Sequence, residues 1–331
     1  MQCRSLRVLV FFTAVLLMAV NTPAPLVYRP GEGWSYESAD GSGPWTRTRA
    51  KDQLEVAKEA FDKKDYKLST KAARRVVRVW PFSDYAPEAQ YLIGRSQEER
   101  GKDEKAFKAY QQLVEKYPKA ANYDEVVERQ YVIANRYLAG QWFKLWGVIP
   151  FFSSMDKTVQ MYEQLIKNGP YSEVAPQAQM NIGEAREKQS DYTAAVKAYE
   201  AAADKYHDRK QVSADAIYKA GMAYLKQATT AEYDQSIAGQ AIATFTDFMT
   251  LYPQDPRVPE AQKNIATLRT EQARGSMIVA RFYEKKRQWD GALVYYNEVL
   301  IRDPQSKFAD EAKQRIEQIK QRQKPVQTAQ R

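Results

Sequence analysis

The feature that most constrains the fold of this chain is a group of small, aromatic and proline residues that recurs at a nearly fixed spacing. The clearest copy has offsets of 12, 16 and 24 residues from its first member, in Gly94, Ala106, Tyr110 and Pro118. The same spacing returns in Gly183, Ala195 and Tyr199, with His207 at the proline position, and in Ala280, Ala292, Tyr296 and Pro304. Two copies are longer, namely Ala134, Thr158, Tyr162, Pro170 and Gly221, Ala241, Phe245, Pro253. A sixth copy lacks the aromatic residue, in Ala57, Ser69, Ala73 and Pro81.

This spacing predicts pairs of antiparallel helices. Two helices of about a dozen residues approach closely only where their side chains are small, and the aromatic ring fills the space beside that crossing. Proline ends the second helix because it lacks the N–H that a helix interior needs. A helical pair of about 34 residues with these features is typical of the tetratricopeptide repeat. We therefore predict an all-α solenoid of about six helix pairs with a C-terminal capping helix.

The links between repeats show a second recurring pattern. It appears in the segments Pro81–Ala89, Pro170–Ala178 and Pro304–Ala312. Each proline starts a turn, and the serine two residues later can cap the free N–H groups of the next helix. Pro87 and Pro176 then fall in a first helical turn, where proline is tolerated.

The N-terminus has the form of a secretory signal. Arg4 and Arg7 precede an apolar run of 13 residues from Val8 to Val20, followed by small and polar residues up to Ala24. The run is short for a membrane-spanning helix. Pro25 disfavours cleavage directly after Ala24, so both a cleaved signal and a retained anchor remain open for residues 1–24.

The remaining boundaries follow from composition and periodicity. Residues 25–48 are rich in Pro, Gly, Ser and aromatics, and we predict a flexible tether there. A second interpretation stays open, in which Trp34, Tyr36 and Trp45 dock on the first repeat or on a partner. The solenoid is predicted over 49–323, and the last residues, 324–331, as a disordered tail. The repeats are expected near 50–81, 87–118, 127–170, 176–207, 214–253 and 273–304.

Composition and motifs argue against nucleic-acid binding and against enzyme activity. The formal net charge is +9, but acidic and basic residues alternate along the predicted helices, so we predict a solvated surface and no nucleic-acid partner. The only cysteine, Cys3, lies in the signal segment, and the only histidine, His207, lies at the end of a repeat, where a loop or capping role is expected. The sequence has no phosphate-binding loop, catalytic triad or metal-ligand spacing. We predict no enzyme activity and no cofactor.

One of the longer copies contains an unusually apolar insertion. Between Ala134 and Thr158 lie 24 residues where 12 are expected, and the excess includes Trp142, Phe143, Trp146, Phe151 and Phe152. Two interpretations remain open: these aromatics fill a gap in the solenoid core, or they form a contact surface for a partner protein or a membrane. The insertion between Gly221 and Ala241 is polar and is expected only to lengthen the helices and their turn.

The last repeat carries a family resemblance. The segment Leu268–Ala292 runs as a long helix into a turn of the form aromatic-Tyr-Glu-Lys, at Phe282–Lys285, followed by Trp289. With the signal segment, the tether and the repeat order, it resembles the BamD family of outer-membrane β-barrel assembly lipoproteins, over about residues 50–323. In one respect the chain departs from that family, because Cys3 precedes the apolar run and no lipobox follows it.

The resemblance implies a non-enzymatic scaffold on the periplasmic face of the outer membrane. It implies that the C-terminal repeats hold a BamA-like barrel protein through the surface around Arg269, Arg281 and Arg287. It also implies that the groove of the repeats at 50–118 receives the extended, aromatic-ended segment of an unfolded β-barrel precursor. The missing lipobox leaves membrane attachment open.

Two other classes compete with this reading. Tol-Pal-linked envelope coordinators also carry such repeats, but they usually place a coiled coil before them, and residues 25–48 show no heptad pattern. A lytic enzyme with a helical superhelix would need a catalytic domain, and no sequence outside the repeats is long enough for one.

Overall fold

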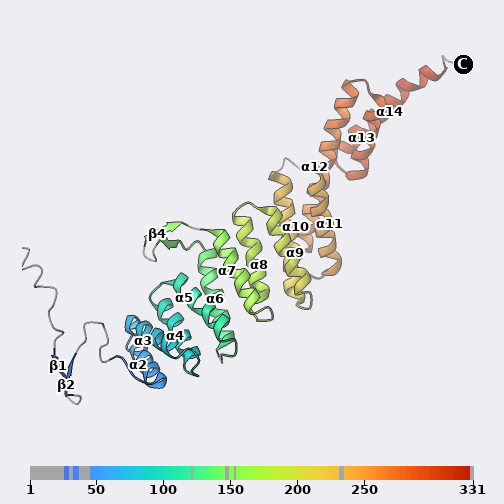
Figure 1. The fold of residues 1–331 in the computed structure, drawn as a ribbon. Helices are drawn as coiled ribbons and strands as arrows, with labels where there is room; N and C mark the ends of the chain where they lie inside the picture. Colours follow the sequence, from blue (N-terminus) through green and yellow to red (C-terminus); the bar gives the residue numbers. More distant parts are fainter. Residues whose placement is uncertain are drawn as a thin grey trace, which may run out of the picture. The chain divides into compact units, whose positions relative to one another are not determined.

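The computed structural model describes residues 26–29, 33–36, 45–120, 122–145, 149–152, 154–230 and 235–328. The predicted signal at 1–24 lies outside these residues. The chain divides into two compact units, Met1–Val126 and Val127–Arg331. In each unit, helices follow one another as antiparallel pairs (Figure 1).

Helices begin and end close to where the spacing predicts. The first unit holds α2 (Ala50–Asp62), α3 (Tyr66–Val79), α4 (Ala86–Glu99) and α5 (Asp103–Lys116). Helix α6 (Tyr123–Leu138) begins at the end of that unit, and the second unit continues with α7 (Met155–Asn168), α8 (Ala175–Lys188), α9 (Tyr192–Lys205), α10 (Lys210–Thr230), α11 (Gln235–Leu251), α12 (Val258–Lys285), α13 (Trp289–Arg302) and α14 (Lys307–Thr328). The described part of the chain thus contains six helix pairs and a closing helix, so the predicted all-α tetratricopeptide solenoid is confirmed.

Strands in the described residues form two short antiparallel hairpins. One joins β1 (Leu26–Arg29) to β2 (Gly33–Tyr36), inside the segment predicted as a tether. The other joins β3 (Phe143–Leu145) to β4 (Ile149–Phe152), inside the apolar insertion. The sequence analysis predicts a flexible tether for the first segment and gives no secondary structure for the second.

The small and aromatic residues of the recurring pattern touch each other across each helix pair. A Cβ atom added to Gly94 would lie 2.2 Å from Cε1 of Tyr110, and one added to Gly183 would lie 2.3 Å from Cε1 of Tyr199. At Gly221 the nearest ring atom, Cε1 of Phe245, would lie 2.8 Å away. Since ordinary carbon contacts are about 3.5–4.0 Å, each ring occupies the space of a missing side chain.

The turn inside a repeat also has a fixed position. Seven residues after the small residue, the backbone adopts a left-handed conformation, with φ of 60° at Lys64, 62° at Gly101, 61° at Ser190 and 57° at Arg287. Only one of the four is glycine, so three side chains adopt a strained backbone there. Two of the following helices start with an aspartate cap, in which Asp65 accepts from the Leu68 N–H and Asp191 from the Ala194 N–H, both at 3.0 Å.

The serine in each link between repeats does not do what the sequence predicts. The hydroxyls of Ser83, Ser172 and Ser306 donate backward, to the carbonyls of Trp80, Gly169 and Asp303, at 2.8–2.9 Å. They therefore close the preceding helix, whose last carbonyls lack partners. Helices α4 and α8 start without a side-chain cap and have proline in the first turn instead.

The ends of the solenoid differ in detail from the prediction. Trp45 packs against the first repeat, and Gln53 binds this segment through its side chain, accepting from the Arg47 N–H at 2.8 Å and donating to the Trp45 carbonyl at 3.1 Å. The tether therefore does not extend to residue 48 as a free chain.

At the C-terminal end, α14 remains helical to Thr328, past the predicted start of the tail at 324. Its apolar face, Ala312, Ile316 and Ile319, is buried against α12 and α13.

We predict that Gly94→Ala lowers the free energy of unfolding by about 1–3 kcal/mol, because the new methyl group overlaps the Tyr110 ring. Gly239→Ala in α11 is the matched control, since nothing lies within 4 Å of the added Cβ. The control should be neutral or stabilising by up to about 1 kcal/mol. Urea unfolding followed by circular dichroism measures both, and equal effects of the two changes would contradict the packing account.

Candidate protein-binding surfaces

In three of the repeats, the tyrosine of the recurring pattern donates to a glutamate that the sequence analysis missed. The Tyr110 hydroxyl donates to Glu98 at 2.8 Å, the Tyr199 hydroxyl donates to Glu187 at 2.7 Å, and Tyr296 donates to Glu284. Each glutamate lies four residues after the small residue of its repeat. Burial, and then the bond to Glu187, raise the pKa of Tyr199, so the phenol stays neutral and donates. These carboxylates thus link the two helices of a pair. Their constant position, four residues after the small residue, was the signal in the sequence that could have identified them.

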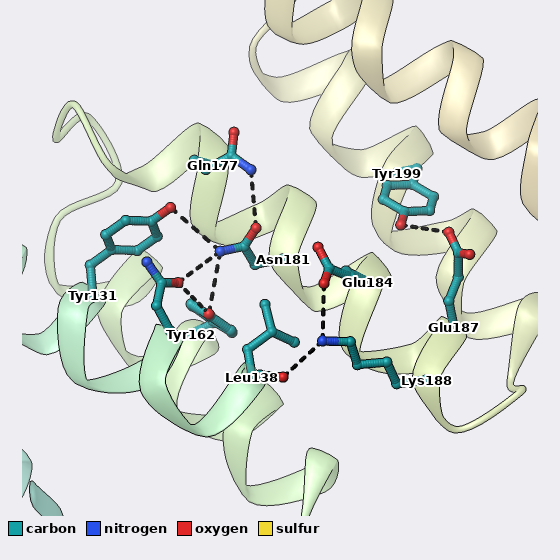
Figure 2. A network of polar contacts seen from close by, with 10 residues as sticks. Tyr131, Leu138, Tyr162, Gln177, Asn181, Glu184, Glu187, Lys188 and Tyr199 are labelled. Carbon is teal, nitrogen blue, oxygen red and sulfur yellow. Dashed lines mark hydrogen bonds and ion pairs between the residues drawn. The ribbon is translucent and has the colours of Figure 1, made fainter. Parts of the chain in front are cut away.

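The repeat formed by α6 and α7 uses amides instead (Figure 2). The Tyr162 hydroxyl donates to Asn135 Oδ1 at 2.6 Å, and Asn181 of α8 donates to the same oxygen at 2.9 Å. Asn181 is buried, and its own carbonyl accepts from Gln177 at 3.0 Å. The cluster joins three consecutive helices of the second unit, so its role is structural.

The apolar insertion divides between the core and the surface. Phe143 is 3% exposed and stacks on Tyr137, with ring centroids 4.1 Å apart. Lys157 Nζ lies 4.9 Å from the centroid of the Phe143 ring. Trp142 is 54% exposed. Trp146 lies outside the described residues, and Phe151 and Phe152 are placed only as backbone positions of β4. Phe143 thus has the packing that the core interpretation expects, and Trp142 has the exposure that the contact interpretation expects.

The C-terminal repeat combines charge with exposed apolar side chains. Arg281 forms a two-oxygen ion pair with Glu311 of α14 at 2.6 and 2.7 Å, while Arg269 and Arg287 are exposed. Next to Arg281 on α12, Ile278 and Phe282 lie one turn apart and are each 56% exposed. Helix α13 exposes Val294 and Ile301. We call Ile278 and Phe282 the α12 apolar pair. Its signal in the sequence was an apolar residue at i and i+4, outside the buried stripe of α12.

The first unit contains a basic groove of about 950 Å³. Helices α3, α4 and α5 and the segment before α2 supply its twelve lining residues, eight of which are Lys or Arg and none Asp or Glu. The eight are Lys67, Lys71, Arg74, Arg75, Arg78, Arg100, Lys102 and Lys105. The sequence analysis missed this site because the cations are three and four residues apart and do not form a continuous tract.

Other predicted positions have ordinary surroundings. The predicted prolines each follow the second helix of a pair by two residues, as Pro118, Pro253 and Pro304 follow α5, α11 and α13. His207 is exposed in the turn after α9, with Nδ1 2.9 Å from the Asp204 carbonyl oxygen. Among the described residues, no group of His, Cys, Asp and Glu side chains could hold a metal ion. Within the same residues, no helix is long and apolar enough to cross a membrane.

We predict that Phe143→Ala lowers the free energy of unfolding by about 3 kcal/mol, because it removes a buried ring from the α6–α7 repeat. Trp142→Ala, its neighbour and control, should change it by at most about 1 kcal/mol. Thermal unfolding of the two variants checks this. A Trp142→Ala variant as unstable as Phe143→Ala would mean that both aromatics belong to the core.

Two parts of the chain match known families. Residues 152–303 match the family described as outer membrane lipoprotein, YfiO, and residues 88–120 match a tetratricopeptide repeat family. No curated protein sequence matches the chain.

Several solved structures resemble the chain at low sequence identity. The C-terminal part of a repeat protein from Cytophaga hutchinsonii is 14% identical over 81% of this chain and 88% of that chain, with a TM-score of 0.37. A repeat protein from Parabacteroides merdae is 13% identical over 82% and 98%, with a TM-score of 0.34. MamA from Desulfovibrio magneticus is 13% identical over 65% and 98%, with a TM-score of 0.31.

Proposed function

We propose that this chain is a non-enzymatic scaffold of the bacterial envelope that binds a BamA-like barrel protein and assists the insertion of β-barrel precursors into the outer membrane. The proposal rests on the match of residues 152–303 to an outer membrane lipoprotein family, and on the protein-binding role that such repeats usually have.

The α12 apolar pair is the observation that carries the proposal. Apolar side chains more than half exposed on a rigid helix usually mark a contact surface when they are grouped. Ile278 and Phe282 are grouped in this way, and they lie inside the matched residues 152–303. Beside them, Lys286 Nζ lies 5.9 Å from the centroid of the Phe282 ring, and Arg281 is paired with Glu311. An apolar centre with a charged rim is the usual composition of a protein interface.

This surface is firmly supported from behind. Met277 and Ala280 of α12 are buried against α13 and α14, with Ala292, Tyr296 and Ile316 in the same cluster. The Arg281–Glu311 pair also joins α12 to α14. Because the supporting helices are already fixed, this surface loses little conformational entropy when a partner binds to it.

We predict that the double variant Ile278→Ser, Phe282→Ser reduces recovery of the barrel protein at least fivefold. The full chain, tagged and expressed in its own host, is extracted in mild detergent, and the co-purified barrel protein is quantified against unaltered chain. The double variant should keep its unfolding midpoint, since exposed substitutions usually change stability by only about 0.5 kcal/mol.

The matched control is Val132→Ser with Leu251→Ser, which removes two apolar side chains of similar exposure from α6 and α11. It should leave recovery of the barrel protein unchanged. Unchanged recovery in the Ile278→Ser, Phe282→Ser variant would mean that the α12 apolar pair does not contact the barrel protein. Recovery of peptidoglycan-associated proteins with no barrel protein would favour a Tol-Pal-type coordinator.

A further inference from the structure

The basic groove has one long wall on α3. Lys67, Lys71, Arg74 and Arg78 are separated by four, three and four residues, so they lie on one face of the helix. At a rise of 1.5 Å per residue, this row extends over about 16 Å. An extended peptide covers that length in about five residues.

The other wall comes from the turn between α4 and α5. Arg100 is the C-terminal cap of α4, Lys102 is the residue before α5, and Lys105 lies in its first turn. With the row on α3, these residues place positive charge on two sides of one concavity. A concave site lined by a single sign of charge concentrates its field and attracts an oppositely charged ligand.

Most of this charge is not neutralised by carboxylates of the chain itself. Six of the eight cations in the groove form no ion pair with any described carboxylate, namely Lys67, Arg74, Arg75, Arg78, Arg100 and Lys105. Some cations outside the groove do form such pairs, as Lys58 does with Glu88 at 2.7 Å. The six lie around one concavity, so a single ligand could reach several of them together.

The spread of the cations favours a peptide over a compact inorganic or lipid anion. The row on α3 extends over about 16 Å, and Arg100 and Lys105 lie on another side of the groove. Carboxylates spaced along an extended peptide can each meet a different cation of this set, whereas a single phosphate group meets only the cations next to it.

One edge of the groove is held in place. Lys71 Nζ lies 4.2 Å from the centroid of the Trp45 ring, and the bonds of Gln53 fix the backbone of this segment. Trp45 is the only aromatic residue in the lining. The lining therefore suits carboxylates far better than the aromatic-ended segment that the family resemblance implies.

We propose that the groove of the first unit binds an extended, acidic segment of a partner protein, with its carboxylates paired to the α3 row and to Arg100 and Lys105. Arginine suits this role because its planar guanidinium can donate two parallel bonds to one carboxylate. The groove lies in the repeats at 50–118, where the family resemblance implies a site for an aromatic-ended segment. The inference goes beyond the proposed function because it assigns this site, outside residues 152–303, to an acidic segment.

Fluorescence anisotropy of the full chain with two labelled nine-residue peptides tests the site. One peptide alternates aspartate with serine, and the other has asparagine at each aspartate position. The aspartate peptide should bind at least tenfold more tightly, with an affinity that falls as salt is raised. The triple variant Lys67→Gln, Arg74→Gln, Arg78→Gln should lose at least tenfold in affinity for it.

The matched control removes the same charge from the same unit at exposed residues outside the groove, as Lys51→Gln, Lys108→Gln, Lys116→Gln. It should bind the aspartate peptide within twofold of the unaltered chain. Equal loss in both triple variants, or equal binding of both peptides, would overturn the proposal. Displacement of the peptide by inorganic polyphosphate or phosphatidylglycerol vesicles at lower anion concentration would also overturn it, in favour of a phosphate-binding site.

The proposal for the groove and the proposed function can be tested independently of each other. The Ile278→Ser, Phe282→Ser variant should bind the aspartate peptide as the unaltered chain does, whether or not it loses the barrel protein.

Discussion

The rest of the structure depends on the contact between an aromatic ring of one helix and a residue of almost no size on its partner. At Gly94, Gly183 and Gly221 the ring occupies the volume where a Cβ would stand. The ring therefore sets how closely the two helices approach. In three of the four copies that carry tyrosine, the hydroxyl then donates to a glutamate one turn further along the first helix, as Tyr110 donates to Glu98. Packing and a hydrogen bond thus specify the same geometry.

A solenoid built from such contacts leaves its outward positions free to vary. Each repeat is stabilised mainly by its own pair and its neighbours, so surface residues can change without loss of the fold. The basic groove lies on α3, α4 and α5, and the α12 apolar pair lies in the last repeat. The two surfaces differ in chemistry, which suits a chain that binds two different partners.

The fold was largely predictable because glycine, alanine and proline act through local sterics that the sequence displays directly. The helix pairs, their order and the closing helix followed from positions such as Tyr199 and Pro304. The hairpin at Phe143 was not predictable, because a short apolar run is compatible with a strand, a loop or a plug. The role of Ser83 was predicted wrongly, since a hydroxyl between two helices can serve either one.

The candidate surfaces were harder to predict than the fold. The partnership of Glu187 with Tyr199 depends on a twelve-residue separation that only the packed helix pair brings together. The groove collects cations from α3, from α5 and from the turn between α4 and α5, and no carboxylate lies in its lining. Both properties depend on which residues are neighbours in the folded chain. In the sequence, nothing distinguishes Arg74 and Arg100 from the many other charged residues of the surface.

A double-mutant cycle at Gly183 and Tyr199 tests the central claim most directly. The account predicts that Gly183→Ala is destabilising alone, and that the same change costs at least about 1 kcal/mol less when Tyr199→Leu has already removed the ring. Strict additivity of the two changes in the free energy of unfolding would contradict it, because the methyl group and the ring would then not compete for one space.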